Sequence, residues 1–219
     1  MFSGSRHVRI IGGTARGRRL ISPPGQSLAI RPTADRAREA LFNIIGRRTE
    51  GAAVLDLYAG TGALGLEAFS RGARSVIFVD HSRLALELIT KNIVACVATK
   101  EERHADRIPP RLQSRFTLIR HDLRRGLPLG QLRRQGPALF DLVFLDPPYD
   151  MGLSRQTLQD WDRDNLLTPD GLLVAEERAE RRPEPQLTTL ELIDQRTYGD
   201  TAFRFFRRLQ ADSPQTQTT

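Results

Sequence analysis

From residue 52 onward the chain alternates short apolar runs with longer stretches of helical periodicity. Strand, helix and strand units of this kind bury their strands when the strands lie parallel and helices cover both faces of the sheet. The sequence therefore predicts an α/β fold with a mostly parallel sheet. The apolar runs occupy residues 52–58, 75–80, 115–122, 138–146 and 171–177, and the helical stretches occupy 62–71 and 83–95.

The last apolar segments predict a different connection. Residues 189–198 and 201–209 are separated by a two-residue Gly-Asp turn, which favours an antiparallel hairpin. We therefore expect a seven-stranded sheet over residues 51–210 that ends in one reversed strand. Residues 211–219 are polar and predict a disordered tail. The charged stretch 98–115 predicts a surface excursion, to which the sequence assigns no purpose.

Residues 1–50 predict a small extension of this domain. Val8–Ile11 and Arg18–Ile21 are spaced to pair as a hairpin across a loop that contains glycine. A helix should follow, with Thr33 as its N-cap and Gly46 as its stop.

Apolar residues of that helix recur at helical spacing. This stripe leaves Arg36, Arg38 and Glu39 to face solvent or a ligand. The stripe consists of Ala37, Ala40, Leu41, Ile44 and Ile45.

The positive charge of the chain is concentrated in the same extension. Residues 1–50 contain ten Arg against three acidic residues, so they account for the whole formal excess of +7. Such a one-sided imbalance favours a polyanionic partner, and nucleic acid is the commonest soluble one. The alternative is a solvated surface in an arginine-rich chain. A general bias toward Arg does not explain why the excess lies at one end.

Aspartates follow four successive strands of the predicted sheet. Asp56, Asp80, Asp122 and Asp146 each lie near the exit of a strand. Ligands of open parallel sheets bind beyond the carboxyl ends of the strands. Aspartate also caps helices at such turns, which could explain one or two of these residues. All four together, beside a glycine loop, predict a binding site.

The glycine loop follows the first strand of this sheet. Gly60, Gly62 and Gly65 satisfy the pattern G-x-G-x-x-G, in which glycine permits a tight turn and a close approach of the backbone to a ligand. Asp80 lies where an acid can accept hydrogen bonds from two ribose hydroxyls. The pair predicts an adenosine-containing cofactor, while the glycines alone fit a nicotinamide dinucleotide equally well. No G-K-[ST] follows the glycines, which argues against a P-loop.

The sequence Asp146-Pro147-Pro148-Tyr149 ends the fourth predicted strand. Proline fixes its own backbone and holds the preceding residue extended, so carbonyls here point outward without a helical partner. The carboxylate and a carbonyl offer two acceptors, and Tyr149 offers a flat face. An exocyclic amine of a nucleobase supplies two N–H donors and a ring that can stack. The alternative is a rigid turn with no ligand.

At these residues the chain resembles the class I S-adenosylmethionine-dependent amino-methyltransferases, whose fourth strand ends in [DN]-P-P-[FYW]. The motifs "RIIGGTARGRRL", "RPTADRAREALFNII", "VLDLYAGTGALGLEAFSRGA", "FDLVFLDPPY" and "YGDTAFRFF" extend the likeness over most of residues 8–209. In this order they resemble the bacterial 16S rRNA guanine-N2 methyltransferases of the small-subunit methyltransferase D type. One departure is that the second strand ends in Asp80, His81 and Ser82, where such proteins usually have Glu and, two residues later, Asp.

The resemblance implies a Rossmann-like class I methyltransferase fold and methyl transfer from S-adenosylmethionine to a guanine N2 amine in 16S rRNA. Asp146 and Pro147 would accept hydrogen bonds from the amine, Pro148 would stiffen the turn, and Tyr149 would stack on the base. The implied cofactor-binding residues are Asp56, Tyr58, Gly60, Thr61, Gly62, Asp80, Asp122 and Leu123. The implied RNA-binding residues are Arg16, Arg18, Arg31, Arg36 and Arg38.

Three alternatives remain at this level. A D-P-P-Y tetrad also suits adenine N6 in DNA or RNA. The glycines suit a nicotinamide-dependent oxidoreductase, and the fold suits an RNA-binding module without catalysis.

The remaining features predict a cytoplasmic monomer without a metal. The N-terminus lacks the apolar core of a signal peptide, and no apolar run is long enough to cross a membrane. Cys96 is the single cysteine, and the four histidines lack metal-ligand spacing. No apolar surface stripe is left over for a partner subunit.

Overall fold

A computed structural model describes residues 8–23, 32–149, 151–179 and 186–209. The predicted tail at 211–219 and the predicted RNA contact at Arg31 lie outside these residues. Among the described residues, no helix combines the length and the apolar character needed to cross a bilayer.

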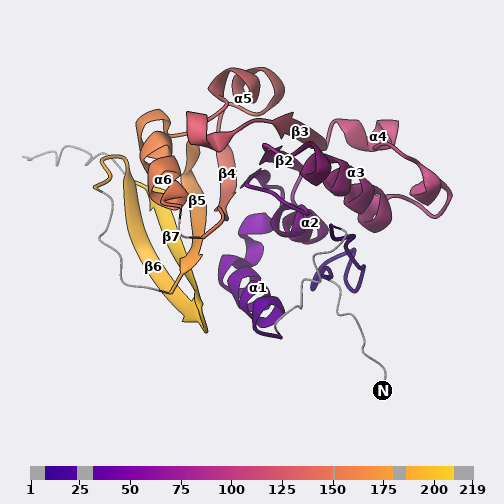
Figure 1. Cartoon of the computed structure of the whole chain (residues 1–219), viewed down its shortest axis with the longest axis horizontal. Helices are drawn as coiled ribbons and strands as arrows, with labels where there is room; N and C mark the ends of the chain where they lie inside the picture. The colour runs from indigo at the N-terminus through magenta and orange to yellow at the C-terminus, as the bar shows by residue number, and fades with distance from the viewer. Residues whose placement is uncertain (1–7, 24–31, 150, 180–185, 210–219) are drawn as a thin grey trace, which may run out of the picture.

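A seven-stranded sheet forms the centre of the molecule, in the order β3-β2-β1-β4-β5-β7-β6 (Figure 1). Every neighbouring pair from β3 to β5 is parallel, and β7 pairs antiparallel with both β5 and β6. The strands are β1 (Ala53–Leu57), β2 (Ser75–Asp80), β3 (Phe116–Arg120), β4 (Phe140–Leu145), β5 (Leu167–Arg178), β6 (Leu190–Tyr198) and β7 (Thr201–Arg208).

The parallel sheet and the C-terminal hairpin confirm the predicted fold class. The one reversed strand is β7, and it lies inside the sheet, between β5 and β6. Residues 202–206 of β7 are buried on both faces, while most of β6 is exposed or half-buried. The more apolar strand therefore takes the interior position, and the polar strand that precedes it in the chain becomes the edge.

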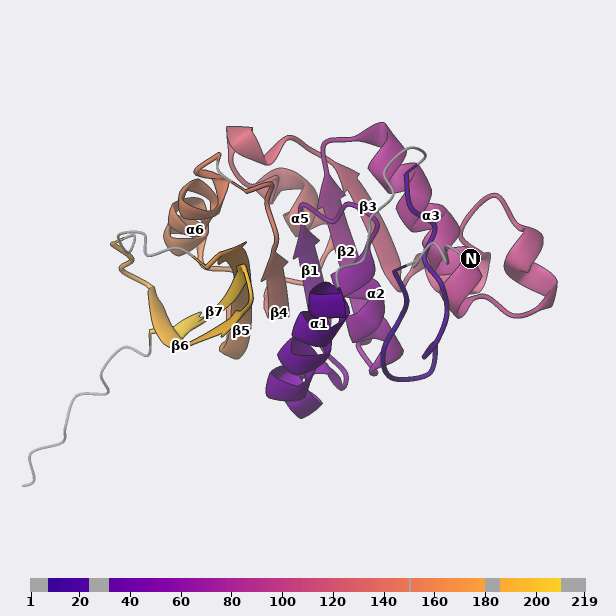
Figure 2. The ribbon, with the colours of Figure 1, turned by 60° about the horizontal axis from the view of Figure 1, so that its bottom comes forward.

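Helices cover both faces of the sheet, as Figures 1 and 2 show. Buried residues of α1, α2 and α3 form one core with one face of the strands, and those of α5 and α6 form a second core on the other face. The helices are α1 (Pro32–Ile45), α2 (Ala63–Ser70), α3 (Arg83–Val97), α4 (Pro110–Gln113), α5 (Leu129–Gln135) and α6 (Leu153–Asp164), with short 3-10 helices η1 (Gly46–Thr49), η2 (Glu101–His104) and η3 (Leu123–Arg125).

The helix of the N-terminal extension departs from its prediction at the start. It begins at Pro32, so Thr33 lies inside the first turn and is not the N-cap. Proline suits a first turn because its missing N–H has no partner there. Gly46 ends the helix as predicted, with a φ of 57°.

Only part of the predicted apolar stripe of α1 is buried. Ala37, Leu41 and Ile45 are buried with Phe42, whose ring lies 5.6 Å from that of Phe144 in β4. Ile44 is 40% exposed. The face of α1 that packs on the sheet therefore contains Phe42 in place of Ile44.

The predicted N-terminal hairpin is present in a minimal form. It contains one antiparallel bridge, between Arg9 and Arg19, and backbone hydrogen bonds such as Ile10 N to Arg18 O at 2.9 Å. A two-stranded ribbon of this size is unstable alone. Its Ile10 and Leu20 are buried in the same core as α1, α2 and α3, so the hairpin depends on the main domain.

Two buried polar side chains fix the hairpin to that domain. The Glu67 carboxylate of α2 accepts hydrogen bonds from Ile11 N at 2.7 Å and Gly12 N at 2.8 Å. Asn92 of α3 accepts from Ile21 N at 2.7 Å and donates to the carbonyls of Ile21 and Thr61. Asn92 thus joins the basic hairpin to the glycine loop.

The charged stretch 98–115 contains η2 and α4 rather than a structureless loop. An Arg111–Glu102 ion pair spans it, and Leu112 is buried in the main core. The surface excursion is therefore ordered by one apolar anchor and one ion pair.

Candidate functional site

Four carboxylates lie on one face of the sheet at the carboxyl ends of adjacent strands. Side chains alternate between the faces of a strand, and Asp56, Asp80, Asp146 and Glu176 share the parity of the residues that pack under α1, α2 and α3. The strand pairs Leu57–Leu145 and Leu145–Ala175 bring the ends of β1, β4 and β5 together. The structure thus brings three of the four predicted strand-end aspartates, Asp56, Asp80 and Asp146, to one face of the sheet.

Two of these acids hold the glycine loop. The Asp56 carboxylate accepts a hydrogen bond from Gly65 N at 2.9 Å, and the Asp80 carboxylate accepts one from Gly60 N at 2.9 Å. Asp80 also accepts from Ser82 N at 2.8 Å. The loop is thus fixed from both ends by buried carboxylates before any ligand binds.

The three glycines of the loop are required for two different physical reasons. Gly60 and Gly62 have φ values of 54° and 77°, in the left-handed region that strains other residues. Gly65 has ordinary geometry but no room, because a Cβ there would lie 2.4 Å from the Phe78 ring. The first two glycines therefore shape the turn, and the third permits α2 to pack on β2.

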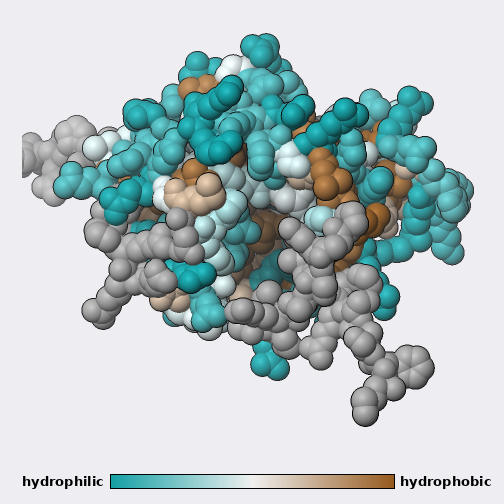
Figure 3. Space-filling model, viewed as in Figure 1, coloured by the Kyte–Doolittle hydropathy of each residue, from teal (hydrophilic) through white to brown (hydrophobic). Residues whose placement is uncertain are grey.

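A cavity of about 430 Å³ opens beside the glycine loop. Asp56 and Asp146 contribute carboxylates to its wall, and Leu84 of α3, which is 49% exposed, contributes an apolar side chain. On the face drawn in Figure 3, hydrophobic atoms gather where α3 lies in Figure 1. The wall also includes Pro23, Tyr58, Ala59, Gly60, Thr61, Ala63, Leu64, Ser82, Ala85 and Leu88.

A second cavity of about 180 Å³ lies beyond Tyr58, which lines both cavities. Asp80, Asp122 and Leu123 line it, so the predicted cofactor-binding residues divide between two adjoining spaces. Tyr58 has a φ of 60°, an uncommon backbone for an aromatic residue, and its hydroxyl lies 2.9 Å from Thr157 Oγ1. This strained residue stands where the two spaces meet.

Asp122 is held at the mouth of the second cavity by an arginine. Its carboxylate accepts hydrogen bonds from Arg124 Nε at 2.9 Å and Arg124 Nη2 at 2.8 Å. These bonds hold the pKa of Asp122 well below its usual range. Asp122 is consequently an ionised acceptor at neutral pH.

The acid-proline corner leaves its carboxylate without a hydrogen bond. The structure records none to the Asp146 side chain among the described residues, and only its backbone N donates, to Leu57 O at 3.4 Å. Burial raises the pKa of Asp146 well above its usual value, and the charges of Glu176 and Asp56 add to the effect. Asp146 is half-buried, so its carboxylate offers a free acceptor at the cavity wall to a ligand with N–H groups.

Tyr149 is 39% exposed and is fixed by its hydroxyl group. The hydroxyl donates to Glu176 Oε1 at 2.9 Å and lies 3.4 Å from Thr201 Oγ1. The guanidinium of Arg178 lies 5.9 Å from the ring centre. Pro147 is buried and Pro148 is exposed, so the corner holds the Tyr149 ring at the surface in a defined position.

Asp56 lies deepest in the row of acids. Burial raises its pKa to about 8, the hydrogen bond from Gly65 opposes that shift, and the charge of Asp80 adds to it. Only 1% of the surface of Asp56 is exposed to solvent. Asp56 therefore carries little charge at neutral pH in the absence of a cation.

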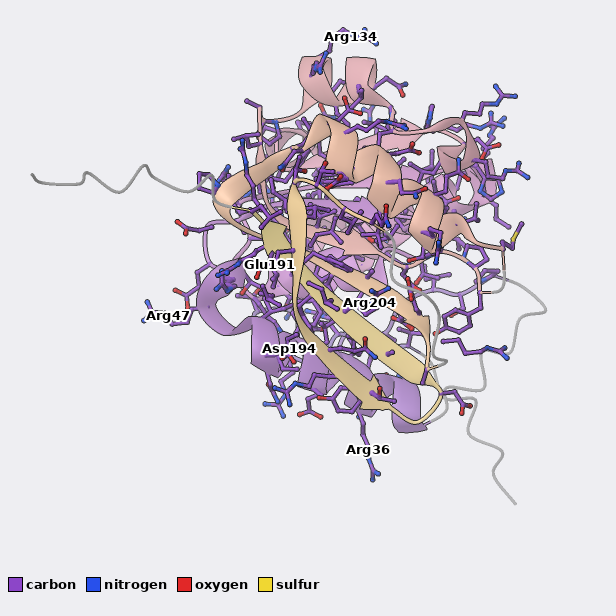
Figure 4. All side chains as sticks on the ribbon, turned by 90° about the vertical axis from the view of Figure 1, so that its left-hand side faces the viewer. Arg36, Arg47, Arg134, Glu191, Asp194 and Arg204 are labelled. Atoms are coloured by element: carbon purple, nitrogen blue, oxygen red, sulfur yellow. The ribbon has the colours of Figure 1, made fainter. Side chains whose placement is uncertain are left out.

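The arginines predicted to bind RNA are not equivalent. Arg16 and Arg36 are exposed, and Arg18 is half-buried. Arg36 extends from α1 at the lower end of the molecule in Figure 4, far from Arg134 of α5. Of the two predicted surroundings of Arg38, solvent or a ligand, the structure excludes solvent, because the side chain is only 12% exposed.

Arg38 instead joins the N-terminal extension to the site. It donates to Arg9 O at 2.8 Å and to Asp35 Oδ1 at 2.9 Å. Its charge acts on Glu176 and opposes the rise of the Glu176 pKa that burial causes. The apolar face of α1 is turned toward β4 and β5, which brings Arg38 over the sheet rather than into solvent.

Glu176 is a site residue that the sequence reasoning missed. It lies near the end of β5 in "GLLVAEE", and the next glutamate, Glu177, belongs to the opposite face, where it pairs with Arg204. Extending the strand-end rule to the fifth strand would have found a glutamate there. It would not have told which of the two faces the site.

The chain matches the family described as conserved hypothetical protein 95 over residues 8–207. It is 32% identical to Ribosomal RNA small subunit methyltransferase D of Escherichia coli K12, covering 94% of this chain and 92% of that protein. It is 30% identical to the protein of the same name from Haemophilus influenzae, covering 91% and 93%.

Solved structures agree with the sheet order and the helix layers. The Escherichia coli protein yhhF superposes with a TM-score of 0.71 at 28% identity, covering 93% of this chain and 98% of that one. A hypothetical protein of Thermus thermophilus superposes with a TM-score of 0.67 at 26% identity, covering 90% and 98%. The architecture is that of the class I methyltransferases.

Proposed function

Because this chain belongs to the family of the ribosomal RNA small subunit methyltransferase D proteins, we propose that it methylates the exocyclic N2 amine of a guanine in 16S rRNA. The observation that carries this proposal is the half-buried Asp146 carboxylate, which has no hydrogen-bond donor among the described residues and lines the cavity beside the glycine loop.

The two adjoining cavities fit S-adenosylmethionine as the methyl donor. Ionised Asp122 and the buried Asp80 suit the amine and hydroxyl donors of an adenosine, and the backbone of the glycine loop lines the larger space. Asp56 lines the larger cavity, and a cationic group of a ligand bound beside it would lower its raised pKa. When bound, the cofactor supplies an electrophilic methyl group on a sulfonium.

The acid-proline corner prepares the amine for attack. The N2 lone pair is delocalised into the guanine ring, so hydrogen bonds from the amine to the Asp146 carboxylate and the Pro147 carbonyl favour the tetrahedral nitrogen needed for attack. The cofactor would supply its methyl group to this aligned nitrogen and leave as the neutral thioether, and the cationic product amine would give its proton to solvent water. No strong base is required before transfer.

The remaining parts position the RNA. Tyr149 stacks on the extruded base, because a base must leave its stack to reach the cavity. Arg16, Arg18 and Arg36 contact phosphates, so binding weakens as salt rises. We assign the substrate as 16S rRNA in an assembling small subunit, and the enzyme as a cytoplasmic monomer.

Labelled S-adenosylmethionine tests the function directly. Incubation with small ribosomal subunits, naked 16S rRNA and duplex DNA should label RNA only, and nucleoside analysis of the product should yield N2-methylguanosine. Label in adenine N6, or in DNA alone, would replace this function with the adenine alternative. Calorimetry that finds binding of NAD but not of S-adenosylhomocysteine would replace it with the oxidoreductase alternative.

A further inference from the structure

We propose that Glu176 is the residue that selects guanine, by accepting a hydrogen bond from the N1–H of the base whose N2 amine Asp146 holds. This inference rests on the proposed function and adds a residue that reads the base. It follows from the place of Glu176 in the sheet, its hydrogen bonds and its charged neighbours.

The sheet places Glu176 beside Asp146. Leu145 of β4 pairs with Ala175 of β5, so the next residue of each strand stands at the same level on the same face. Burial raises the pKa of Asp146, and the charge of Glu176 adds to that rise. Two acidic acceptors therefore lie side by side at the corner where the base enters.

One oxygen of Glu176 remains available. Oε1 accepts the hydrogen bond from the Tyr149 hydroxyl, and the structure records no other hydrogen bond to this side chain among the described residues. The same contact fixes Glu176 relative to the ring on which the base stacks. Glu176 is thus oriented by Tyr149 and has an acceptor to spare.

Arg38 limits the rise of the Glu176 pKa. Burial raises the pKa of Glu176, and the Tyr149 hydrogen bond and the charge of Arg38 both oppose that shift. Arg38 is itself buried, with Nε lacking a hydrogen-bond partner. The charges of Asp35, Glu67 and Glu176 attract Arg38, which favours the inward position of this arginine of the basic extension.

Guanine matches two adjacent acceptors, and adenine does not. The Watson–Crick edge of guanine presents N1–H next to the N2 amine, whereas adenine presents an acceptor at N1 next to its N6 amine. A carboxylate facing N1 would therefore attract guanine and repel adenine. A site built to accept a hydrogen bond strongly rejects an analogue that lacks the donor, because the buried acceptor is left unpaired.

The analogue 2-aminopurine tests this contact, because it keeps the N2 amine but has an acceptor at N1. Small subunits are reconstituted with 16S rRNA that carries either guanine or 2-aminopurine at the modified position, and methyl transfer to each is measured. The wild-type enzyme should prefer guanine in kcat/KM by on the order of 10- to 100-fold, the scale of a hydrogen bond to a charged group. Equal transfer to both bases would overturn the proposal without any variant.

Glu176→Gln should reduce this preference to within a few-fold, because its amide can donate to N1 of 2-aminopurine. The matched control is Glu191→Gln, which removes an exposed glutamate from the edge strand β6 and should keep the full preference. If Glu176→Gln keeps the preference, another contact, such as one to O6, reads the base and the proposal fails.

Tyr149→Phe distinguishes a direct contact between Glu176 and the base from a role of Glu176 in holding Tyr149. It removes the hydroxyl bound to Glu176 and keeps the ring, so it should lower turnover but retain much of the preference for guanine. If it abolishes the preference as fully as Glu176→Gln does, then Glu176 acts only by holding Tyr149, and the proposal is wrong. Absence of any transfer to guanine by the wild-type enzyme would instead refute the proposed function itself.

Discussion

The two halves of the site treat their acids in opposite ways. In the glycine-loop half, Asp56 and Asp80 accept hydrogen bonds from backbone N–H groups of the loop. In the acid-proline half, Asp146 has no hydrogen bond to its carboxylate among the described residues, and Glu176 lies beside it. The protein itself supplies hydrogen-bond donors to the acids of the glycine-loop half. In the other half, the Asp146 carboxylate gains a donor only when a ligand binds.

The difference separates holding a cofactor from activating a substrate. A loop that the protein itself satisfies is already organised when the ligand binds, which lowers the entropic cost of binding. An unsatisfied buried acceptor gains most when a substrate amine reaches it, and gains more as that amine becomes positively charged. Changes in the two halves should therefore have distinct effects.

The largest effect should follow Asp146→Ala, because this change removes the acceptor that holds the amine. We expect methyl transfer to rRNA to fall at least about 100-fold, the scale found when one aligned hydrogen-bond partner of a transition state is lost. Binding of S-adenosylhomocysteine, measured by calorimetry, should change little. The matched variant Asp146→Asn keeps an acceptor oxygen and should retain more activity. If both variants are as active as the wild type, the corner has no role in transfer.

Asp56 should control how stability depends on pH. Its folded pKa of about 8 lies above the ordinary value of 3.8, so the folded state holds a proton that the unfolded state releases between these pH values. Stability contributed in this way is present below pH 4 and is lost as pH rises toward 8, at up to about 1.4 kcal/mol per pH unit.

Asp56→Asn should reduce the loss of stability with rising pH. Without cofactor, the variant should therefore be more stable than the wild type above pH 7. Denaturant unfolding at pH 5 and pH 8 measures the difference. Asp194→Asn, at a half-buried position on the edge strand β6, is the control and should leave the wild-type slope. A wild-type slope in Asp56→Asn would show that its carboxyl is not the buried proton carrier.

Gly65→Ala tests the packing under the glycine loop. Its Cβ would meet the Phe78 ring at 2.4 Å and Val76 at 2.8 Å, so we expect a loss of about 1–3 kcal/mol in the free energy of unfolding. Gly130→Ala is the control, because the atom closest to its Cβ is the flexible end of Arg134, at 3.4 Å. That exposed helical change should be neutral or slightly stabilising. Equal outcomes for the two variants would contradict the crowding at Gly65.

The smallest effect should follow removal of one surface arginine outside both halves. Arg36→Ala should weaken binding to rRNA about equally at all sequences and reduce the salt slope by roughly 0.7–0.9 for the lost phosphate contact. Turnover at saturating RNA should stay unchanged. Arg134→Ala, at the opposite end of the view in Figure 4, should leave the slope as it is. The reverse result would move the RNA surface to α5.

Much of the molecule could be predicted from local patterns. The alternation of strands and helices gave the parallel sheet, and the Gly199-Asp200 turn gave the hairpin, because each pattern is set by neighbours in the chain. The rule that ligands bind at the carboxyl edge of a parallel sheet singled out the four strand-end aspartates as candidate site residues. The start of α1 at Pro32 was predicted wrongly, and the interior position of β7 was not predicted, because local signals do not rank competing caps or strand positions.

By itself, the sequence determined the sheet, the glycine loop and the acid-proline corner, since periodicity and backbone geometry are encoded over a few residues. Tertiary structure alone decided that Arg38 turns inward, that Glu176 rather than Glu177 faces the site, and that Asn92 ties the basic hairpin to the glycine loop. These contacts join residues far apart in the chain. Their partners are chosen by the rotation of each element on the sheet, which depends on how the whole core packs.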